Sequence, residues 1–148
     1  MAKSSFWRSV WGACSYGLWP DLGLLIGRLM FGGIMALSHG WVKLSGFSEM
    51  ATKFADPIGL GAKPSLVLAI FAEFFCAILV MAGALTRLAT IPLITTMGVA
   101  FFIVHRADPF PRKELALMFL TAWVVLLLTG PGRFSVDYLL AGGRRTPR

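Results

Sequence analysis

Hydrophobic residues gather in four stretches that short polar segments separate, at about residues 22–44, 66–85, 88–105 and 114–129. A helix crosses the apolar core of a bilayer, about 30 Å thick, with about 20 mostly apolar residues. The first two stretches reach this length, and the last two are shorter and would cross with little tilt. The pattern therefore predicts an all-α membrane protein with four transmembrane helices.

Composition agrees with a membrane protein and excludes an ordinary soluble domain. Hydrophobic residues make up 57% of the 148 residues and the mean hydropathy is +0.74, whereas soluble domains are about 45–50% apolar. A chain of this length is too small to bury four apolar helices completely inside a soluble core.

The connections predict how the four helices are arranged. Only Thr86 and Arg87 separate the second stretch from the third, while Pro109 and Pro111 interrupt the chain before the fourth. Short links force neighbouring helices to run in opposite directions, and proline prevents a helix from continuing through the link. We expect an antiparallel four-helix bundle over residues 21–130.

Short interfacial helices are expected on both sides of this bundle. Residues 1–20 mix tryptophans with Lys3 and Arg8, a combination that settles among lipid headgroups. Gly130-Pro-Gly132 stops the fourth helix, and residues 131–148 then resume an apolar pattern over 133–140 and end in a basic tail.

Charged and histidine residues within the apolar stretches are candidates for a functional site, because an unpaired charge in hydrocarbon costs several kcal/mol. Alternating helix directions place one group of them at the end of the bundle away from the termini. Glu73 is expected about 10 Å deep, given a rise of about 1.5 Å per residue. The group is expected around one polar cavity and consists of His39, Lys43, Glu73, His105 and Glu114.

A second group is expected at the end that carries the termini. Helical spacing places Arg28 on the same face of the first helix as His39 and Lys43. We expect this second group to form a structural charge network, with Asp21 as an alternative partner. The network consists of Arg28, Arg87, Arg133 and Asp137.

Each of these residues also has a purely structural interpretation. Lys43 can extend to the headgroups, His105 can be an interfacial residue, and all the charges together can simply hold the helices. The two histidines suggest a bis-histidine haem, but few of their possible geometries fit one. Cys14 and Cys76 lie far apart without a C-x-x-C motif, so a dithiol relay, zinc and iron–sulfur ligation have no support.

Five sequence elements together resemble the DoxX family of small four-helix bacterial membrane proteins. They are RLMFG at 28–32 followed by HGWVKL at 39–44, Glu73, GALTR at 83–87, Glu114, and GPGRFSVD at 130–137. The resemblance covers about residues 23–140 and implies a multi-pass protein of the bacterial inner membrane. The family is similar to the small subunits of thiosulfate:quinone oxidoreductase, and some members are associated with membrane-tethered thiol and oxidant metabolism.

Two classes of function stay open. The resemblance implies a membrane subunit of a redox-linked system, in which the polar cavity binds a quinone or a small sulfur or thiol species and a soluble redox protein is the partner. The sequence shows no soluble catalytic domain and no cofactor attachment motif, so we expect a subunit rather than a stand-alone enzyme. The alternatives are a non-enzymatic anchor or scaffold for a soluble partner, and a transporter formed by a homo-oligomer.

Lysine and arginine indicate the orientation by a narrow margin. Seven lie on the side of the termini and six on the other side, and three arginines follow the last apolar segment closely. Positive charge near a helix end resists translocation, so we expect both termini in the cytoplasm. The pI of about 10.1 then indicates attraction to anionic lipids. Nucleic-acid binding gains no support, because the cations are spread over both faces.

Cysteine labelling tests the number of crossings, because an even number places both termini on one side. We expect Cys14 and a cysteine introduced at Gly142 to react with an impermeant maleimide from the same side of inner-membrane vesicles. Labelling from opposite sides would contradict four crossings.

Overall fold

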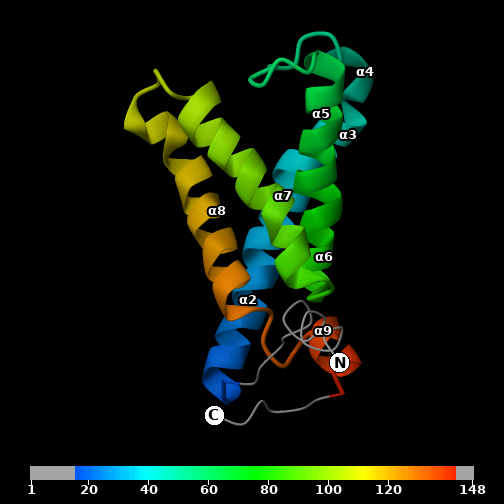
Figure 1. Ribbon diagram of the computed structural model, residues 1–148, viewed down its shortest axis with the longest axis vertical. Coiled ribbons are helices and arrows are strands. Elements are labelled where there is room, and N and C mark those ends of the chain that lie inside the picture. Colours follow the sequence, from blue (N-terminus) through cyan, green and yellow to red (C-terminus); the bar gives the residue numbers. More distant parts are fainter. Residues whose placement is uncertain (1–15, 143–148) are drawn as a thin grey trace, which may run out of the picture.

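The computed structural model describes residues 16–142, and every regular element within them is helical, with no strand (Figure 1). The interfacial helix expected over residues 1–15 and the basic tail at 143–148 lie outside the described residues. The elements are α2 (Leu18–Ile34), η1 (Met35–Gly40), α3 (Trp41–Ser45), α4 (Phe47–Met50), α5 (Ala62–Ile70), η2 (Phe71–Cys76), α6 (Ala77–Ala82), α7 (Thr86–Val99), η3 (Ala100–Val104), α8 (Phe110–Thr129) and α9 (Val136–Leu140).

Three continuous helices are long and apolar enough to cross a membrane: Leu18–Ser45, Ala62–Ala82 and Thr86–Val104. They agree with the first three predicted spans. The fourth predicted span corresponds to α8, which has 20 residues but carries Arg112, Lys113 and Glu114 near its start. Because of these three charges, α8 is less uniformly apolar than the three long helices.

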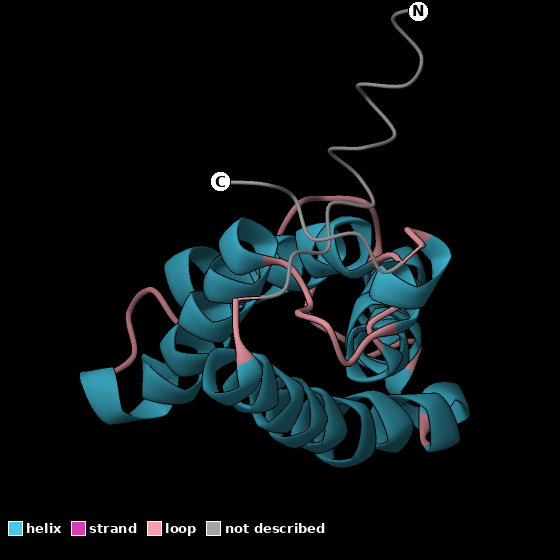
Figure 2. Cartoon of the chain, turned by 90° about the horizontal axis from the view of Figure 1, so that it is seen from below, coloured by secondary structure: helices cyan, strands magenta, loops and turns pink. Residues whose placement is uncertain are grey.

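The helices run alternately up and down around a common axis (Figures 1 and 2). One end of the body carries α9, the start of α2 and the turn at residues 83–86, and is called here the terminal end. The opposite end carries α4, residues 51–61 and residues 105–109, and is called the loop end. Toward the loop end, α3 and α5 diverge from α7 and α8 (Figure 1).

A cluster of buried apolar side chains joins the helices between these two ends. Trp123 of α8 and Leu93 of α7 are completely buried at its centre, beside Met35 and Val80. Many large apolar side chains are instead exposed on the outside, among them Leu37, Phe102 and Leu128. An apolar exterior around a packed interior is the arrangement that a lipid environment favours.

The first long helix approaches the second closely at Gly32, which has no side chain. A Cβ atom on Gly32 would lie 2.5 Å from Cγ of Met81 and 3.2 Å from the carbonyl oxygen of Ala77. By contrast, a Cβ on Gly23 or Gly27 would have nothing within 4 Å. Gly32 therefore permits close packing of the two helices, whereas Gly23 and Gly27 do not contribute to this contact.

Each of the three long helices contains a π-helical segment, which the sequence pattern did not indicate. The segments are η1, η2 and η3. A π turn bonds residue i to i+5 and so admits an additional residue, and such turns often occur at functional sites. All three lie toward the loop end or in the middle of the body (Figure 1).

At the terminal end, two buried side chains of opposite charge hold the tight turn between α6 and α7. Arg28 of α2 is completely buried and donates hydrogen bonds to the carbonyl oxygens of Val80 and Met81, each at 3.4 Å, and of Phe134 at 2.5 Å. Asp137 of α9 accepts hydrogen bonds from the backbone N–H groups of Leu85 at 2.7 Å and Thr86 at 2.9 Å.

These contacts satisfy backbone groups that every helix leaves open at its ends. The last carbonyls of α6 lack intrahelical donors and carry partial negative charge, and the first N–H groups of α7 lack acceptors. Arg28 supplies the donors and Asp137 the acceptor. Gly83 lies between them with φ +68°, and a Cβ there would lie only 2.0 Å from Nη1 of Arg28. The turn therefore requires both charges and a glycine.

The other two members of the expected charge network are placed differently. Arg87 is half-buried and its Nη2 lies 3.5 Å from the carbonyl oxygen of Leu128. The side chain of Arg133 is exposed and lies over the ring of Phe134 at 4.7 Å, so it does not join the turn. Only its backbone N–H reaches the buried carboxylate of Asp21, at 3.3 Å. Arg133 follows Gly132, whose φ of +76° redirects the chain at this point.

Replacing Arg28 with Leu is expected to lower the free energy of unfolding by about 3–5 kcal/mol, because it leaves buried carbonyls and the Asp137 carboxylate without their cation. Arg133→Leu is the matched control and should change it by about 0.5 kcal/mol or less, since its side chain is exposed. Unfolding of both variants by SDS in mixed micelles measures the difference. Equal stability of the two would contradict the role assigned to Arg28.

Candidate functional site

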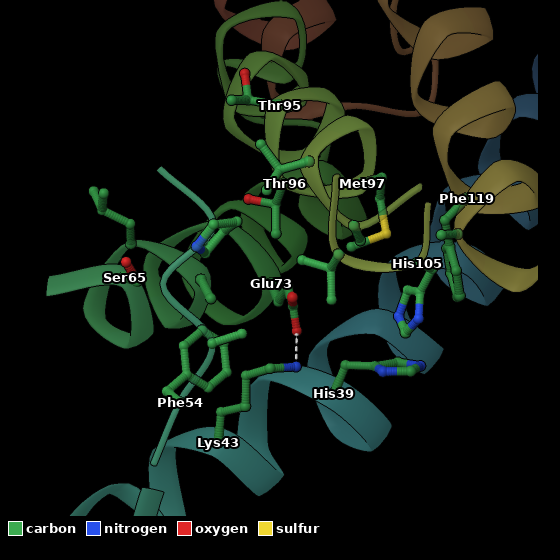
Figure 3. Close-up of a pocket in the computed structure, with 18 of the residues that line it drawn as sticks. His39, Lys43, Phe54, Ser65, Glu73, Thr95, Thr96, Met97, His105 and Phe119 are labelled. Carbon is green, nitrogen blue, oxygen red and sulfur yellow. Dashed lines mark hydrogen bonds and ion pairs between the residues drawn. The ribbon is translucent and has the colours of Figure 1, made fainter. Parts of the chain in front are cut away.

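A cavity of about 380 Å³ lies at the loop end, where the helices diverge (Figure 3). Its walls come from η1 and α3, from α5 and η2, from α7 and η3, and from α8, and residues 54, 55, 57 and 58 also line it. Most lining side chains are apolar. Four of the five residues expected at the polar cavity line it, namely His39, Lys43, Glu73 and His105.

Lys43 and Glu73 form an ion pair in the wall of this cavity. Nζ of Lys43 lies 2.5 Å from Oε2 of Glu73, and the two side chains are 20% and 6% exposed. Figure 3 shows the ammonium and carboxylate groups pointing toward one another. Since removing one partner of a buried pair leaves an uncompensated charge, the two residues depend on one another.

The pair forms because the backbones of η1 and η2 touch at Gly40. A Cβ on Gly40 would lie 2.6 Å from the carbonyl oxygen of Glu73 and 2.7 Å from Cα of Phe74. Real Cβ atoms do not approach backbone so closely, so only glycine fits here. His39 precedes this contact directly and Lys43 follows it by one turn, which brings both side chains to the level of Glu73.

His39 is held by an aromatic contact with α8. Its ring lies 5.8 Å from that of Phe119 at an interplanar angle of 81°, an edge-to-face arrangement. Phe119 is buried and stacks on Trp123 with the ring centroids 6.0 Å apart. The imidazole is therefore oriented by a rigid aromatic column rather than by a hydrogen-bonding side chain.

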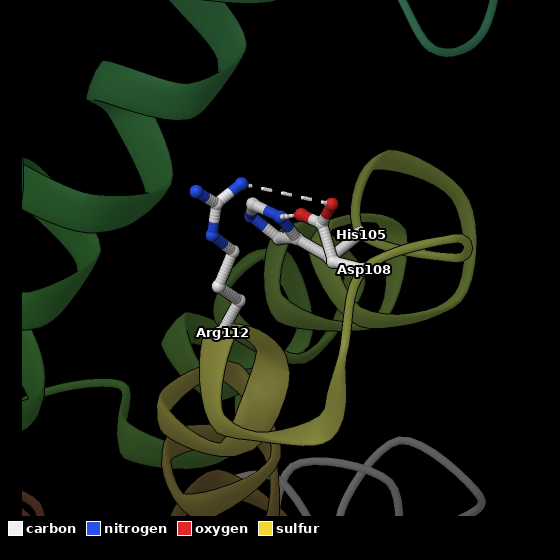
Figure 4. A network of polar contacts seen from close by, with 3 residues as sticks. All are labelled: His105, Asp108 and Arg112. Atoms are coloured by element: carbon white, nitrogen blue, oxygen red, sulfur yellow. Dashed lines mark hydrogen bonds and ion pairs between the residues drawn. The ribbon is translucent and has the colours of Figure 1, made fainter.

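His105 lies at the mouth of the cavity, directly after η3. Its Nδ1 is 2.8 Å from Oδ2 of Asp108, and Oδ1 of Asp108 is 3.9 Å from Nη1 of Arg112 (Figure 4). The hydrogen bond with His105 lowers the pKa of the Asp108 carboxyl from its ordinary value, so this group is ionised at neutral pH. Sequence reasoning missed Asp108, although its position three residues after His105 in a proline-terminated turn was a usable signal.

Glu114 does not join the cavity, contrary to expectation. It is exposed and lines a second cavity of about 580 Å³ between α2 and α8, beside Gly23 and Gly27. The reason is helical periodicity within α8. Residues 112, 115, 116 and 119 share the face toward the first cavity, whereas residues 114, 117, 118 and 121 share the face toward α2.

Asp56 fixes the connection that covers the first cavity, and sequence reasoning missed this role too. Its carboxylate accepts hydrogen bonds from the N–H groups of Leu60 at 2.9 Å and Gly61 at 2.8 Å, and from Oγ of Ser65 at 3.0 Å. These hydrogen bonds lower the pKa of the Asp56 carboxyl from its ordinary value, and the bond from Gly61 has the largest effect. The Asp-Pro pair followed by two glycines was the available signal.

Within residues 16–142, no three histidine, cysteine, aspartate or glutamate side chains come together in a way that could hold a metal ion. Cys76 is a free, buried thiol that belongs to the apolar cluster. Cys14 lies outside the described residues.

Comparisons with known proteins agree with the resemblance seen in the sequence. The DoxX family model matches residues 23–106, a segment that contains the four predicted site residues that line the cavity and ends before α8. Inner membrane protein YqjF of Escherichia coli strain K12 is 27% identical over 126 residues, covering 81% of this chain and 93% of that protein. No solved structure gives a significant match.

A methyl group at Gly40 tests the backbone contact that positions Glu73. Gly40→Ala should destabilise the protein by about 2–4 kcal/mol, because the helices must separate and the core beside them opens. Gly27→Ala is the matched control in the same helix, where nothing lies within 4 Å of the added Cβ. It should be neutral or stabilising by up to about 1 kcal/mol. Unfolding in mixed micelles checks both, and a harmless Gly40→Ala would contradict the contact.

Proposed function

This chain belongs to the DoxX family of membrane proteins, and from that premise we propose that it is a membrane subunit of a redox-linked system that binds a quinone headgroup in its loop-end cavity. Its inner-membrane relative and its apolar helices support a place in the bacterial inner membrane. The proposal rests above all on one observation. A mostly apolar cavity contains the Lys43–Glu73 ion pair, whose carboxylate is buried, together with two histidines.

These residues match the chemistry of a quinone headgroup. The ring is flat and apolar, and its two carbonyl oxygens accept hydrogen bonds from lysine or histidine N–H groups. Reduction adds two electrons and two protons, so the site needs groups that can deliver protons to those oxygens. The electrons come from a soluble redox partner in this proposal.

The charge balance of the cavity favours a neutral headgroup over an anion. Lys43 is compensated by Glu73 within the wall, and Arg112 at the mouth lies near the Asp108 carboxylate. Within residues 16–142, the lysine and the arginine that line the cavity thus each lie beside a carboxylate, which opposes binding of a full negative charge. A small anionic sulfur species is therefore the less favoured ligand.

The position of the cavity favours a ligand that arrives from the bilayer. It lies where α5 and α7 diverge (Figure 1), and its lining includes Leu68 of α5 and Thr95 of α7, both exposed on the outer surface. An isoprenoid tail would extend between these helices into lipid while the headgroup stays inside.

In the proposed topology, α8 is the fourth crossing and α9 lies in the interface at the terminal end. A cytoplasmic position of the terminal end is supported by the lysines and arginines, of which seven lie on that side and six on the other. The first turn of α8, with its three charges, then lies among headgroups at the opposite face, so only its apolar remainder lies in hydrocarbon.

A membrane anchor or scaffold for a soluble partner is the alternative function, because paired charges such as Lys43 and Glu73 also serve to hold helices together. Deleting the chain distinguishes the two functions. Release of a partner from membranes with unchanged turnover would favour the anchor, and loss of quinone-linked turnover would favour the subunit.

Binding of decylubiquinone to the purified protein in nanodiscs tests the proposed site. Glu73→Gln should retain the fold and weaken binding at least about tenfold, which corresponds to about 1.4 kcal/mol, because the amide keeps the shape but disrupts the ion pair. Lys43→Gln should act in the same direction. Lys63→Gln is the matched control, since Lys63 is exposed and does not line the cavity.

Titration followed by quinone extraction and mass analysis gives the dissociation constants, and melting temperatures report folding. The proposed site would be contradicted by a wild-type protein that does not bind decylubiquinone, or by a folded Glu73→Gln protein whose affinity is unchanged at every pH.

A further inference from the structure

We propose that His105, held by Asp108, is the inlet through which protons reach a quinone in the loop-end cavity. The inference rests on the proposed function and adds to it the side from which protons come and the residue that passes them. Asp108 acts as the positioning residue for this histidine.

His105 is placed between water and the cavity. It lines the cavity, while its side chain is 37% exposed and that of Asp108 is 31% exposed. Glu73 also lines the cavity, but its side chain is 6% exposed and bound to Lys43. A buried, paired carboxylate exchanges poorly with water, so a site that works repeatedly needs a second group with contact to the outside.

The hydrogen bond with Asp108 determines which nitrogen of His105 acts. Nδ1 lies 2.8 Å from Oδ2 of Asp108, so its proton is donated to that carboxylate. Nε2, on the opposite side of the ring, is then the nitrogen that gains and loses a proton. The carboxylate also stabilises the positive charge of the protonated ring, as in other carboxylate–histidine pairs.

Several charged or titratable groups lie around His105, on its own segment and on the neighbouring helices. Arg106 is its exposed neighbour in the chain, and Arg112 of α8 lies 3.9 Å from the same Asp108 carboxylate. Lys113 of α8 lies over the ring of Phe101, 5.5 Å from its centroid. His39, Lys43 and Glu73 line the cavity from η1, α3 and η2. Asp108 is the group that touches the imidazole directly.

The bound quinone receives two electrons from a reduced electron-carrying protein. The protonated imidazole gives its Nε2 proton to a quinone carbonyl oxygen, so an O–H bond forms, an N–H bond breaks and the ring becomes neutral. Water at the loop end restores the proton to Nε2. The same transfer through Nε2 is then repeated, which supplies the second proton and completes the quinol.

Chemical reduction of bound decylubiquinone in nanodiscs tests this path without the natural partner. Dithionite supplies the two electrons, and absorbance follows quinol formation by stopped flow between pH 5 and 9. Dissociation constants and melting temperatures are measured for the same samples. The variants are His105→Gln, Asp108→Asn and Asp108→Glu, with Arg106→Gln as the matched control, because Arg106 is exposed and lies outside the cavity lining.

We expect His105→Gln to slow reduction at least tenfold and to abolish its pH dependence, with a dissociation constant within about twofold of wild type. Asp108→Asn should slow reduction less than His105→Gln does and should alter the rate–pH profile, because the imidazole loses the carboxylate that orients it. Asp108→Glu should restore much of the wild-type profile, and Arg106→Gln should retain it.

The outcomes separate the two proposals. If wild type binds decylubiquinone but His105→Gln and Asp108→Asn keep the wild-type rate and pH profile, the inlet is wrong and the quinone site stands. A parallel loss of melting temperature and binding in both variants would give these residues a structural role only and overturn the inlet. Failure of wild type to bind decylubiquinone would overturn both proposals.

Discussion

The rest of the structure depends on satisfying the buried backbone groups at the turn between α6 and α7. A two-helix hairpin without a linker leaves carbonyls and N–H groups open where no water can reach them. Arg28 and Asp137 satisfy them from opposite sides, although 109 positions of sequence separate these residues. The turn thereby ties the first helix, the central hairpin and the segment after α8 together.

A second constraint follows at the other end of the same two helices. With α2 and α6 fixed at the terminal end, contact at Gly32 and then at Gly40 brings the backbones of η1 and η2 together. The helices α7 and α8 diverge from this pair toward the loop end, and the space between them becomes the cavity. The site is thus a consequence of tight packing in one half of the body and divergence in the other.

The electrostatics of the molecule follow the same principle of local compensation. At the terminal end, charged side chains meet backbone dipoles, whereas at the loop end Lys43 meets Glu73 and Asp108 lies between His105 and Arg112. Compensated charges can remain in an apolar body because each removes the desolvation penalty of its partner. The same compensation leaves a cavity suited to a neutral polar ligand, while the more exposed His105 and Asp108 keep contact with water.

The sequence by itself determined where the apolar helices lie and which polar residues belong to each end, because helix length and direction follow from local pattern alone. It therefore brought His39, Lys43, Glu73 and His105 to one region, and Arg28 and Asp137 to the other. Only the tertiary structure decided which side chains meet. It turned Glu114 toward α2, directed the Arg133 side chain outward, paired His105 with Asp108, and introduced the π turns. Helix rotation, and the additional residue that a π turn admits, arise from packing against neighbouring helices, which local sequence does not encode.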